Sequence, residues 1–327
     1  MTTRVASHAG SWYTSNGKKL QSELEAWLET VNIEGTVLPV PGARVIIAPH
    51  AGYSYSGETA AWAYKSLDFS NCKRVFLLGP SHAYYLSGCA LSKHAKYATP
   101  LGDLVIDKEI VAELQKTGKF DVMSIQNDET EHSLEMHLPY IYTMISKTFN
   151  DASEYPTLIP ILVGNTNPTK EQDFGKILAP YLEDPTSVFV VSSDFCHWGT
   201  RFQYTYYLPQ ASIEARSSKG HPLHRRDPTP TNPPIHDSIN ELDKQAMDAI
   251  ESGKHEAFLT NLAETENTVC GRHPIGVVMA AIEILEKGGK ASDPANGKFK
   301  FVKYARSSEV EDITDSSVSY ASAYAVI

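Results

Sequence analysis

Short apolar runs alternate along the chain with longer segments of helical periodicity. The runs are rich in β-branched residues and predict buried strands at 44–48, 74–78, 157–163 and 188–192. Helical patterns between and before them span 58–67, 108–116, 132–147 and 171–182. Strands that alternate with helices predict an α/β fold, an αβ sandwich around a mostly parallel central sheet.

The last third of the chain has a different pattern. Amphipathic helices are predicted at 239–252 and 274–287, followed by alternating segments at 299–304 and 317–324 that are typical of half-buried strands. The stretch 217–237 holds five prolines and three histidines without any period. We expect it to be an exposed, poorly ordered insert loop in a single domain that covers residues 1–327.

The composition of the chain excludes several classes of function. With 42% hydrophobic and 21% charged residues, the chain is typical of a globular protein. A net charge of -10 predicts no nucleic-acid binding, because phosphate recognition needs a basic surface. No apolar run reaches the ~20 residues that span a bilayer, and the N-terminus lacks a signal-peptide pattern, so no membrane insertion and a cytoplasmic, also nuclear, location are expected. The four cysteines form no CxxC pair, so a cysteine with a functional role would be a metal ligand or a catalytic nucleophile.

Two strand ends share one form, in which a proline and then a histidine follow the strand. His50 follows Pro49, and His82 follows Pro80 and Ser81. Because ligands bind beyond the carboxyl ends of parallel strands, both imidazoles are expected in one crevice. The alternative is a pair of turn histidines with ordinary hydrogen bonds.

A third strand end carries Asp194 and His197, three positions apart. A turn there would present both side chains to one cavity, where they could orient a bound group or exchange protons. The alternative is an aspartate that caps the next helix, with His197 at the surface.

Cys270 stands just before the helix predicted at 274–287. The helix dipole and the neighbouring Arg272 are expected to favour its thiolate, the form that binds metals and attacks electrophiles. An inert buried cysteine is the alternative.

Further candidates lie near the start of the 132–147 helix and in two aromatic segments. His132 is expected at most to support a ligand, because Glu131 and Glu135 also fit a plain solvated first turn. Trp12 and Tyr53 could wall a pocket, although aromatic residues are more often part of the core.

Six ordered blocks, spread from about residue 4 to the C-terminus, resemble the Memo family, called mediator of cell motility in animals. The blocks are HAGSWY (8–13), APHAGYSYSG (48–57), LGPSH (78–82), EHSLEMHLPY (131–140), VVSSDFCHWG (190–199) and TVCGRHPIG (268–276). The family's fold resembles class III extradiol dioxygenases, non-haem iron enzymes that cleave catechol rings. The resemblance therefore implies an αβ sandwich of that class, interrupted by the 217–237 insert.

The resemblance also implies roles for individual residues. His50 and His82 match the family's metal-binding pair and Cys270 its third ligand. Asp194 and His197 match polar residues of the same pocket, and Trp12 matches an aromatic residue associated with phosphopeptide binding. Iron as Fe²⁺ is the expected cofactor, with copper or zinc as alternatives, because a thiolate is a softer donor than the carboxylate of the extradiol enzymes.

Three functions follow from these residues. The first is an iron or copper redox protein, in which Asp194 and His197 handle protons and a small molecule binds in the metal pocket. The second is a module that binds a phosphotyrosine-containing peptide in the same pocket. The third, a hydrolase with Cys270 as nucleophile, is the weakest, because no oxyanion hole is evident beyond the helix start.

Overall fold

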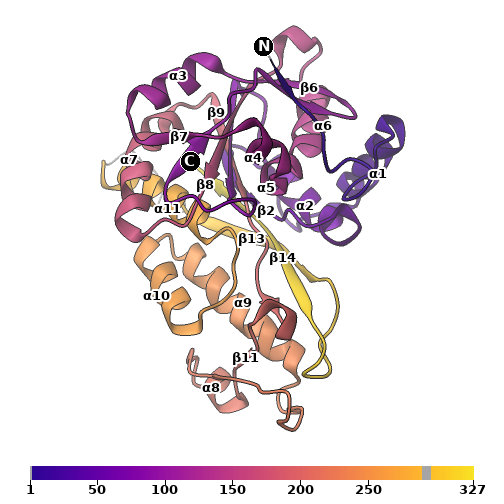
Figure 1. Ribbon diagram of the computed structural model, residues 1–327, viewed down its shortest axis with the longest axis vertical. Coiled ribbons are helices and arrows are strands. Elements are labelled where there is room, and N and C mark those ends of the chain that lie inside the picture. The colour runs from indigo at the N-terminus through magenta and orange to yellow at the C-terminus, as the bar shows by residue number, and fades with distance from the viewer. Residues whose placement is uncertain (1, 289–295) are drawn as a thin grey trace.

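A mixed sheet runs through the centre of the molecule (Figure 1). The computed structural model describes residues 2–288 and 296–327. Over those residues the sheet has nine strands, in the order β10-β14-β2-β9-β3-β8-β4-β7 with β13 paired to β14. They are β2 (Ala43–Ala48), β3 (Arg74–Pro80), β4 (Cys89–Leu91), β7 (Phe120–Val122), β8 (Thr157–Val163), β9 (Ser187–Ser192), β10 (His197–Trp198), β13 (Phe299–Arg306) and β14 (Ser317–Val326).

The parallel part of the sheet is its middle. β2, β9, β3 and β8 are parallel neighbours, and every residue of β2 and β9 is buried. β14 and β4 join this core in antiparallel fashion on its two sides. The α/β class, the central sheet and the two C-terminal strands are thus confirmed, but the sheet is mixed rather than mostly parallel, because β14 and the short strand β4, which was not predicted, pair antiparallel with their neighbours.

Helices cover both faces of the sheet (Figure 1). α1 (Gly17–Thr30), α2 (Tyr53–Ser66) and α6 (Leu138–Thr148) pack together on one side, whereas α7 (Pro168–Glu183) and α11 (Arg272–Lys287) pair closely on the other. The remaining helices are α3 (Lys108–Lys116), α4 (Ile125–Thr130), α5 (His132–Glu135), α8 (Gln210–Glu214), α9 (Ile235–Glu251) and α10 (His255–Thr265). Smaller sheets are formed by β1 (Thr3–Arg4), β5 (Lys96–Thr99) and β6 (Gly102–Val105), and by β11 (Tyr206–Tyr207) with β12 (His221–Pro222).

The helix expected over 132–147 is broken in two. α5 ends at Glu135, and α6 starts at Leu138 with Pro139 in its first turn. Proline lacks the N–H that a continuous helix would use, so it fits a new helix start better than a helix interior. The break gives α5 its own direction, and α5 contacts β3 next to the strand end that carries His82.

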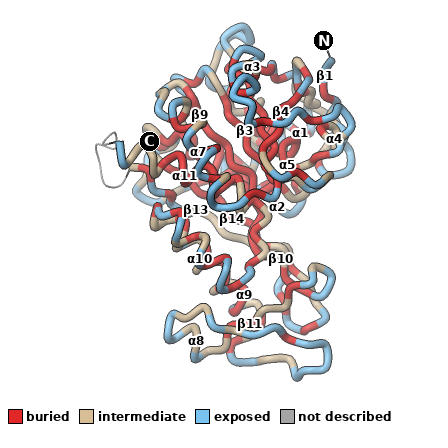
Figure 2. The backbone as a smooth tube through the Cα atoms, turned by 60° about the vertical axis from the view of Figure 1, so that its left-hand side comes forward, coloured by how far each residue is buried: buried red, intermediate tan, exposed pale blue. Residues whose placement is uncertain are grey.

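The 217–237 segment is more ordered than its composition predicts. It contains β12 and the start of α9, and Leu223 and Ile235 are buried in a second hydrophobic cluster with Trp198 and Tyr207. This cluster fills the part of the molecule that projects beyond the sheet, where α8, β11 and α9 lie (Figures 1 and 2). Buried side chains therefore anchor the segment to the protein, although most of its residues are exposed or half-buried, as expected for an insert loop.

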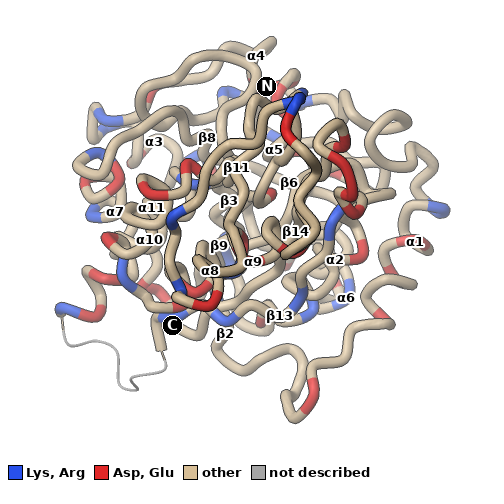
Figure 3. Tube along the Cα trace, turned by 90° about the horizontal axis from the view of Figure 1, so that it is seen from below, with Lys and Arg blue, Asp and Glu red and all other residues tan. Residues whose placement is uncertain are grey.

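Charged residues are scattered over many elements. Seen from below, Lys and Arg lie among Asp and Glu rather than gathering on one helix or loop (Figure 3). Within the described part of the chain, no helix is both long and apolar enough to cross a membrane.

Candidate metal centre

Three neighbouring strands deliver the predicted side chains to one edge of the sheet. β9 lies between β2 and β3, and all three run parallel. His50, Asp194 and His82 each follow the last residue of one of these strands by two positions. The shared form of the strand ends thus brings these side chains into one region, as the sequence pattern predicts.

Cys270 reaches the same region from the loop before α11. Its Sγ lies 3.3 Å from Nε2 of His50 and accepts a hydrogen bond from the N–H of Asp194 at 3.1 Å. Gly271 permits this approach, because a Cβ there would stand 2.3 Å from Cβ of Ser193. Only glycine lets the Cys270 loop lie this close to the end of β9.

His132 joins the two strand-end histidines. The nearest ring nitrogens of His50, His82 and His132 all lie within 4.8 Å of one another, a spacing that could hold a metal ion. The ring of His132 stacks on that of His82 with centroids 4.4 Å apart. Gly79 allows α5 to come this near β3, since a Cβ there would meet Oγ of Ser133 at 2.7 Å.

Hydrogen bonding fixes the tautomer of His50. Nδ1 of His50 lies 2.6 Å from Oγ of Ser192, and that hydroxyl donates its single proton to the carbonyl of Ser133. Nδ1 must therefore carry the hydrogen, which leaves the lone pair on Nε2, the atom that faces Cys270. His50 is thereby prepared as a metal ligand.

Glu131 fixes the tautomer of His82 in the same way. Its carboxylate accepts from the backbone N–H of His82 at 2.6 Å and from Nδ1 at 3.0 Å, so Nε2 keeps its lone pair. Burial opposes the charge of Glu131, but hydrogen bonds from His82 and electrostatic interactions with His82 and His132 bring its pKa to about 2. The solvated first turn considered for Glu131 and Glu135 is not found, because both side chains are fully buried. A carboxylate behind an imidazole is the arrangement that orients metal-binding histidines.

Burial keeps three side chains of the site neutral when no metal is bound. Burial lowers the pKa of His50 well below its usual value and lowers that of His132 to about 4. Burial also raises the pKa of the Cys270 thiol. The guanidinium of Arg272 donates to the carbonyls of Asn267 and Val269, and its charge does not offset the burial of the thiol, so the expected thiolate is not favoured. A bound metal would therefore have to displace the thiol proton itself.

Asp194 and His197 both line the cavity in front of these ligands. Oδ1 of Asp194 accepts from the backbone N–H of His50 at 2.8 Å, and burial raises the pKa of Asp194. Nδ1 of His197 donates to the carbonyl of Phe195 at 2.8 Å, which leaves Nε2 as an acceptor. The pair could hold or move protons beside the ligand cluster.

The cavity has a volume of about 530 Å³ and opens between aromatic side chains. Trp12 stands at its edge, 36% exposed, with its ring 4.6 Å from that of His132. Tyr53 is not among the lining residues, because its ring is buried and its hydroxyl donates to the carbonyl of Met136. Tyr55, two residues further along α2, lines the cavity instead and is 62% exposed. Arg201 contributes a cation to the same wall.

A family model described as Memo-like protein matches residues 4–324. The chain belongs to the Memo family. It is 49% identical to Protein MEMO1 of Homo sapiens over 318 residues, which cover 97% of this chain and 95% of that protein. It is 45% identical to Protein MEMO1 of Danio rerio, covering 100% and 98%, and 42% identical to the memo-1 homolog of Caenorhabditis elegans, covering 98% and 81%. The resemblance in the six sequence blocks is thereby confirmed.

Among solved structures, this Memo family chain is similar to an uncharacterized protein, JW3007, from Escherichia coli K12. The match covers 84% of this chain and 98% of the other, with 11% identity and a TM-score of 0.36. That likeness is too low to assign a fold class, so the extradiol-like class stays a prediction.

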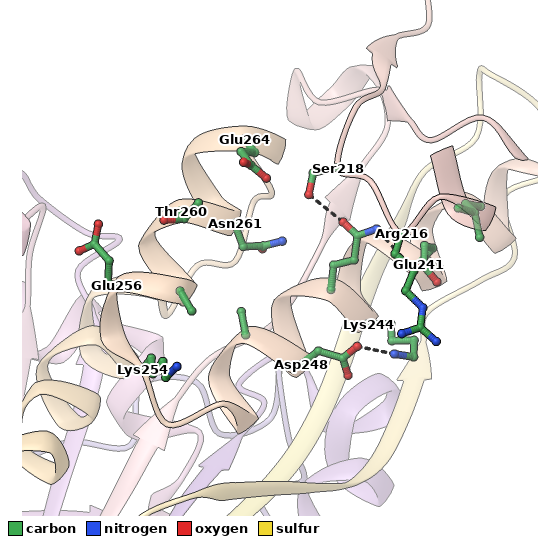
Figure 4. A pocket seen from close by; sticks show the side chains of 14 residues that line it. Arg216, Ser218, Glu241, Lys244, Asp248, Lys254, Glu256, Thr260, Asn261 and Glu264 are labelled. Atoms are coloured by element: carbon green, nitrogen blue, oxygen red, sulfur yellow. Dashed lines mark hydrogen bonds and ion pairs between the residues drawn. The ribbon is translucent and has the colours of Figure 1, made fainter. Parts of the chain in front are cut away.

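A second cavity of the Memo family chain, about 790 Å³, lies between α9 and α10 (Figure 4). Its charged side chains are partly paired with each other, as Lys244 is with Asp248. None of its described lining residues is a histidine or a cysteine, so it lacks the imidazole and thiol donors of the strand-end site.

Proposed function

We propose that this protein is a metal-binding redox protein whose site is built from His50, His82 and Cys270. The observation that carries the proposal is the convergence of two imidazoles, each with Nδ1 tied to a buried acceptor, while Cys270 Sγ lies 3.3 Å from the free Nε2 of His50. His132 is near enough to replace or supplement the thiol as a donor.

Iron as Fe²⁺ is the proposed metal, with copper or zinc as alternatives. Two imidazoles suit all three, while a thiolate shifts affinity toward copper and zinc. A bound iron or copper ion would supply one-electron chemistry. Asp194 and His197 would hold or accept protons at the mouth of the site, since both line the same cavity.

Metal content of matched variants tests this proposal. Wild type, His50→Ala and Cys270→Ala would be titrated with Fe²⁺ without oxygen, and with Cu⁺ and Zn²⁺, and bound metal would be measured by mass spectrometry. Cys72→Ala is the control, because Cys72 is a buried thiol that donates to the Arg74 carbonyl at the opposite end of β3 from His82. We expect one ion per wild-type and Cys72→Ala chain and weaker binding in the other two. Equal metal content in all four proteins would refute the proposal.

A second candidate function is recognition of a phosphotyrosine-containing peptide. Its support is the exposed rings of Trp12 and Tyr55 together with Arg201, which line the cavity and have the chemistry to hold an aromatic ring and an anion. Among the described residues, the guanidinium of Arg201 stacks over Phe202 at 4.6 Å and has no carboxylate partner.

Peptide titration separates the two functions. A phosphotyrosine peptide and its unphosphorylated form would be titrated into wild type, Arg201→Gln and the distant control Arg225→Gln. If the peptide binds in this cavity, Arg201→Gln alone should lose affinity, and only for the phosphorylated peptide. Equal binding by all three proteins would exclude the cavity as the peptide site.

The hydrolase hypothesis has the least support. A nucleophilic cysteine needs an imidazole that takes its proton, but burial lowers the pKa of His50 and raises that of Cys270. The pair is therefore most stable as neutral thiol and neutral imidazole, which is the unreactive state.

A further inference from the structure

His8 is held in the same manner as His82, although it lies outside the proposed ligand set. The carboxylate of Glu135 accepts from the backbone N–H of His8 at 2.8 Å and from Nδ1 at 2.9 Å. Glu131 makes the same pair of bonds to His82. Two carboxylates four positions apart thus each hold one histidine by its backbone and its ring.

This hold leaves Nε2 of His8 free to bind a cation. The carboxylate of Glu135 also accepts from the guanidinium of Arg4 and the hydroxyl of Tyr13, so it acts as an acceptor throughout and Nδ1 of His8 is the donor. Within the described residues, Nε2 of His8 has no hydrogen-bond partner, and the side chain is 16% exposed. A neutral imidazole backed by a carboxylate is typical of metal ligands.

His132 connects His8 to the inner histidines. The ring centroid of His132 is 6.1 Å from that of His8, 4.4 Å from that of His82 and 5.4 Å from that of His50. Two imidazoles that bind one ion with bonds of about 2.1 Å have centroids roughly 5–6 Å apart. The spacing between His8 and His132 is therefore close to what a shared ion needs.

The outer pair should bind more weakly than the inner site. Arg4 and Tyr13 also hydrogen-bond to Glu135, at 2.6 and 2.8 Å, so its charge is shared and strengthens His8 less than Glu131 strengthens His82. Among the described residues, no hydrogen bond joins a cysteine to His8, whereas Cys270 contacts His50 in the inner site. Weaker binding at the outer position allows an ion to move inward, where more donors converge.

We propose that His8 and His132 form an outer binding position for a divalent cation on its way to His50, His82 and Cys270. Trp12 covers this position, with its ring 5.5 Å from that of His8 and 4.6 Å from that of His132. The inference rests on the proposed metal-binding function and adds a route of entry to it.

Metal-binding kinetics test the route. Anaerobic stopped-flow mixing with Co²⁺ would follow two signals: quenching of tryptophan fluorescence, to which Trp12 contributes, and the charge-transfer absorbance of a cobalt thiolate, which reports arrival at Cys270. The variants are His8→Gln and His8→Asn, with His224→Gln, an exposed histidine of the 217–237 segment, as the control.

Both His8 variants should lose the early fluorescence step and show thiolate absorbance that rises about tenfold more slowly, on the scale of a lost supporting ligand. Dissociation into excess chelator should slow by the same factor, so that the equilibrium affinity stays equal to that of wild type and His224→Gln. An unchanged rate in both His8 variants would overturn the inference, as would a lower affinity at an unchanged association rate. A wild type that binds no Co²⁺, Fe²⁺, Cu⁺ or Zn²⁺ would instead overturn the proposed function itself.

Discussion

The Sγ of Cys270 lies 3.3 Å from Nε2 of His50, across 220 positions of sequence. Because Nδ1 of His50 donates to Ser192, this contact joins a protonated sulfur to an unprotonated nitrogen. A metal that binds both atoms must release the thiol proton. Among the proposed donors, Cys270 is therefore the one whose replacement should most change which metal the site prefers.

Replacing Cys270 by aspartate should change which metal the site prefers. Cys270→Asp exchanges a soft donor for a hard one, so the preference for Cu⁺ and Zn²⁺ over Fe²⁺ should fall by about tenfold, the scale on which ligand changes alter metal affinity. Competition titrations between Zn²⁺ and Fe²⁺ measure this ratio, and Cys270→Ser controls for loss of sulfur alone. An unchanged ratio in Cys270→Asp would show that His132, not Cys270, is the third donor.

Glu131→Gln should weaken metal binding without removing a ligand. Glutamine keeps the size of the side chain but not the charge that holds Nδ1–H of His82, so affinity should drop by about 10–100-fold. Isothermal titration with Zn²⁺ measures the change, and Glu109→Gln on the exposed face of α3 is the control. Wild-type affinity in Glu131→Gln would mean that His82 is not a ligand.

The main strands and the strand-end histidines could be predicted because they depend on local pattern. The apolar runs at β2 and β3 are directly followed by His50 and His82, and parallel pairing brings such ends together. The mixed character of the sheet could not be predicted, since β4 has only three residues and gives no periodic signal, and the alternating pattern of β14 does not reveal that it pairs antiparallel with β2.

Other parts of the site depend on tertiary contacts that local sequence does not encode. His132 joins the cluster only because α5 is separated from α6 and packs on β3 beside Gly79. Glu131 looks like a solvated residue in the sequence, yet it is buried by the histidine it holds. Tyr53 was predicted to line the pocket, but it is buried, and Tyr55, two positions further along α2, faces the cavity instead.

The buried pair of Arg4 and Glu135 predicts a pH dependence of stability. The pKa of Glu135 is about 2 in the folded protein against an ordinary value of 4.5, so its ionised form stabilises the fold by about 3 kcal/mol at neutral pH. Because the folded pKa is the lower one, this contribution is complete above pH 4.5 and is lost as the pH falls toward 2.

Glu135→Gln should therefore be less stable than wild type at neutral pH by about 3 kcal/mol and should lose less stability on acidification. Urea unfolding at several pH values between neutral and about 3 gives the free energy of unfolding of each protein. Glu109→Gln should follow the wild-type curve. A Glu135→Gln curve parallel to that of wild type would assign the acid sensitivity to other carboxylates.

Gly79→Ala tests whether the close approach of α5 to β3 builds the metal site. The added methyl would stand 2.7 Å from Oγ of Ser133 and 3.0 Å from Cδ2 of Leu134, so α5 must move away from the strand. Overpacking of this kind costs about 1–3 kcal/mol. Because His132 and the Glu131 that holds His82 belong to the same short segment, metal affinity should fall together with stability.

Gly88→Ala controls for the general effect on stability of replacing a glycine by alanine. A Cβ at Gly88 would meet Cζ of Phe174 at 3.6 Å, an ordinary contact, so that variant should keep its stability and its Zn²⁺ affinity. Thermal unfolding and Zn²⁺ titration of both variants give the two quantities. If Gly79→Ala loses stability but binds Zn²⁺ as wild type does, then His50, His82 and Cys270 hold the metal without help from α5. The imidazole of His132 is then a neighbour of the site rather than part of it.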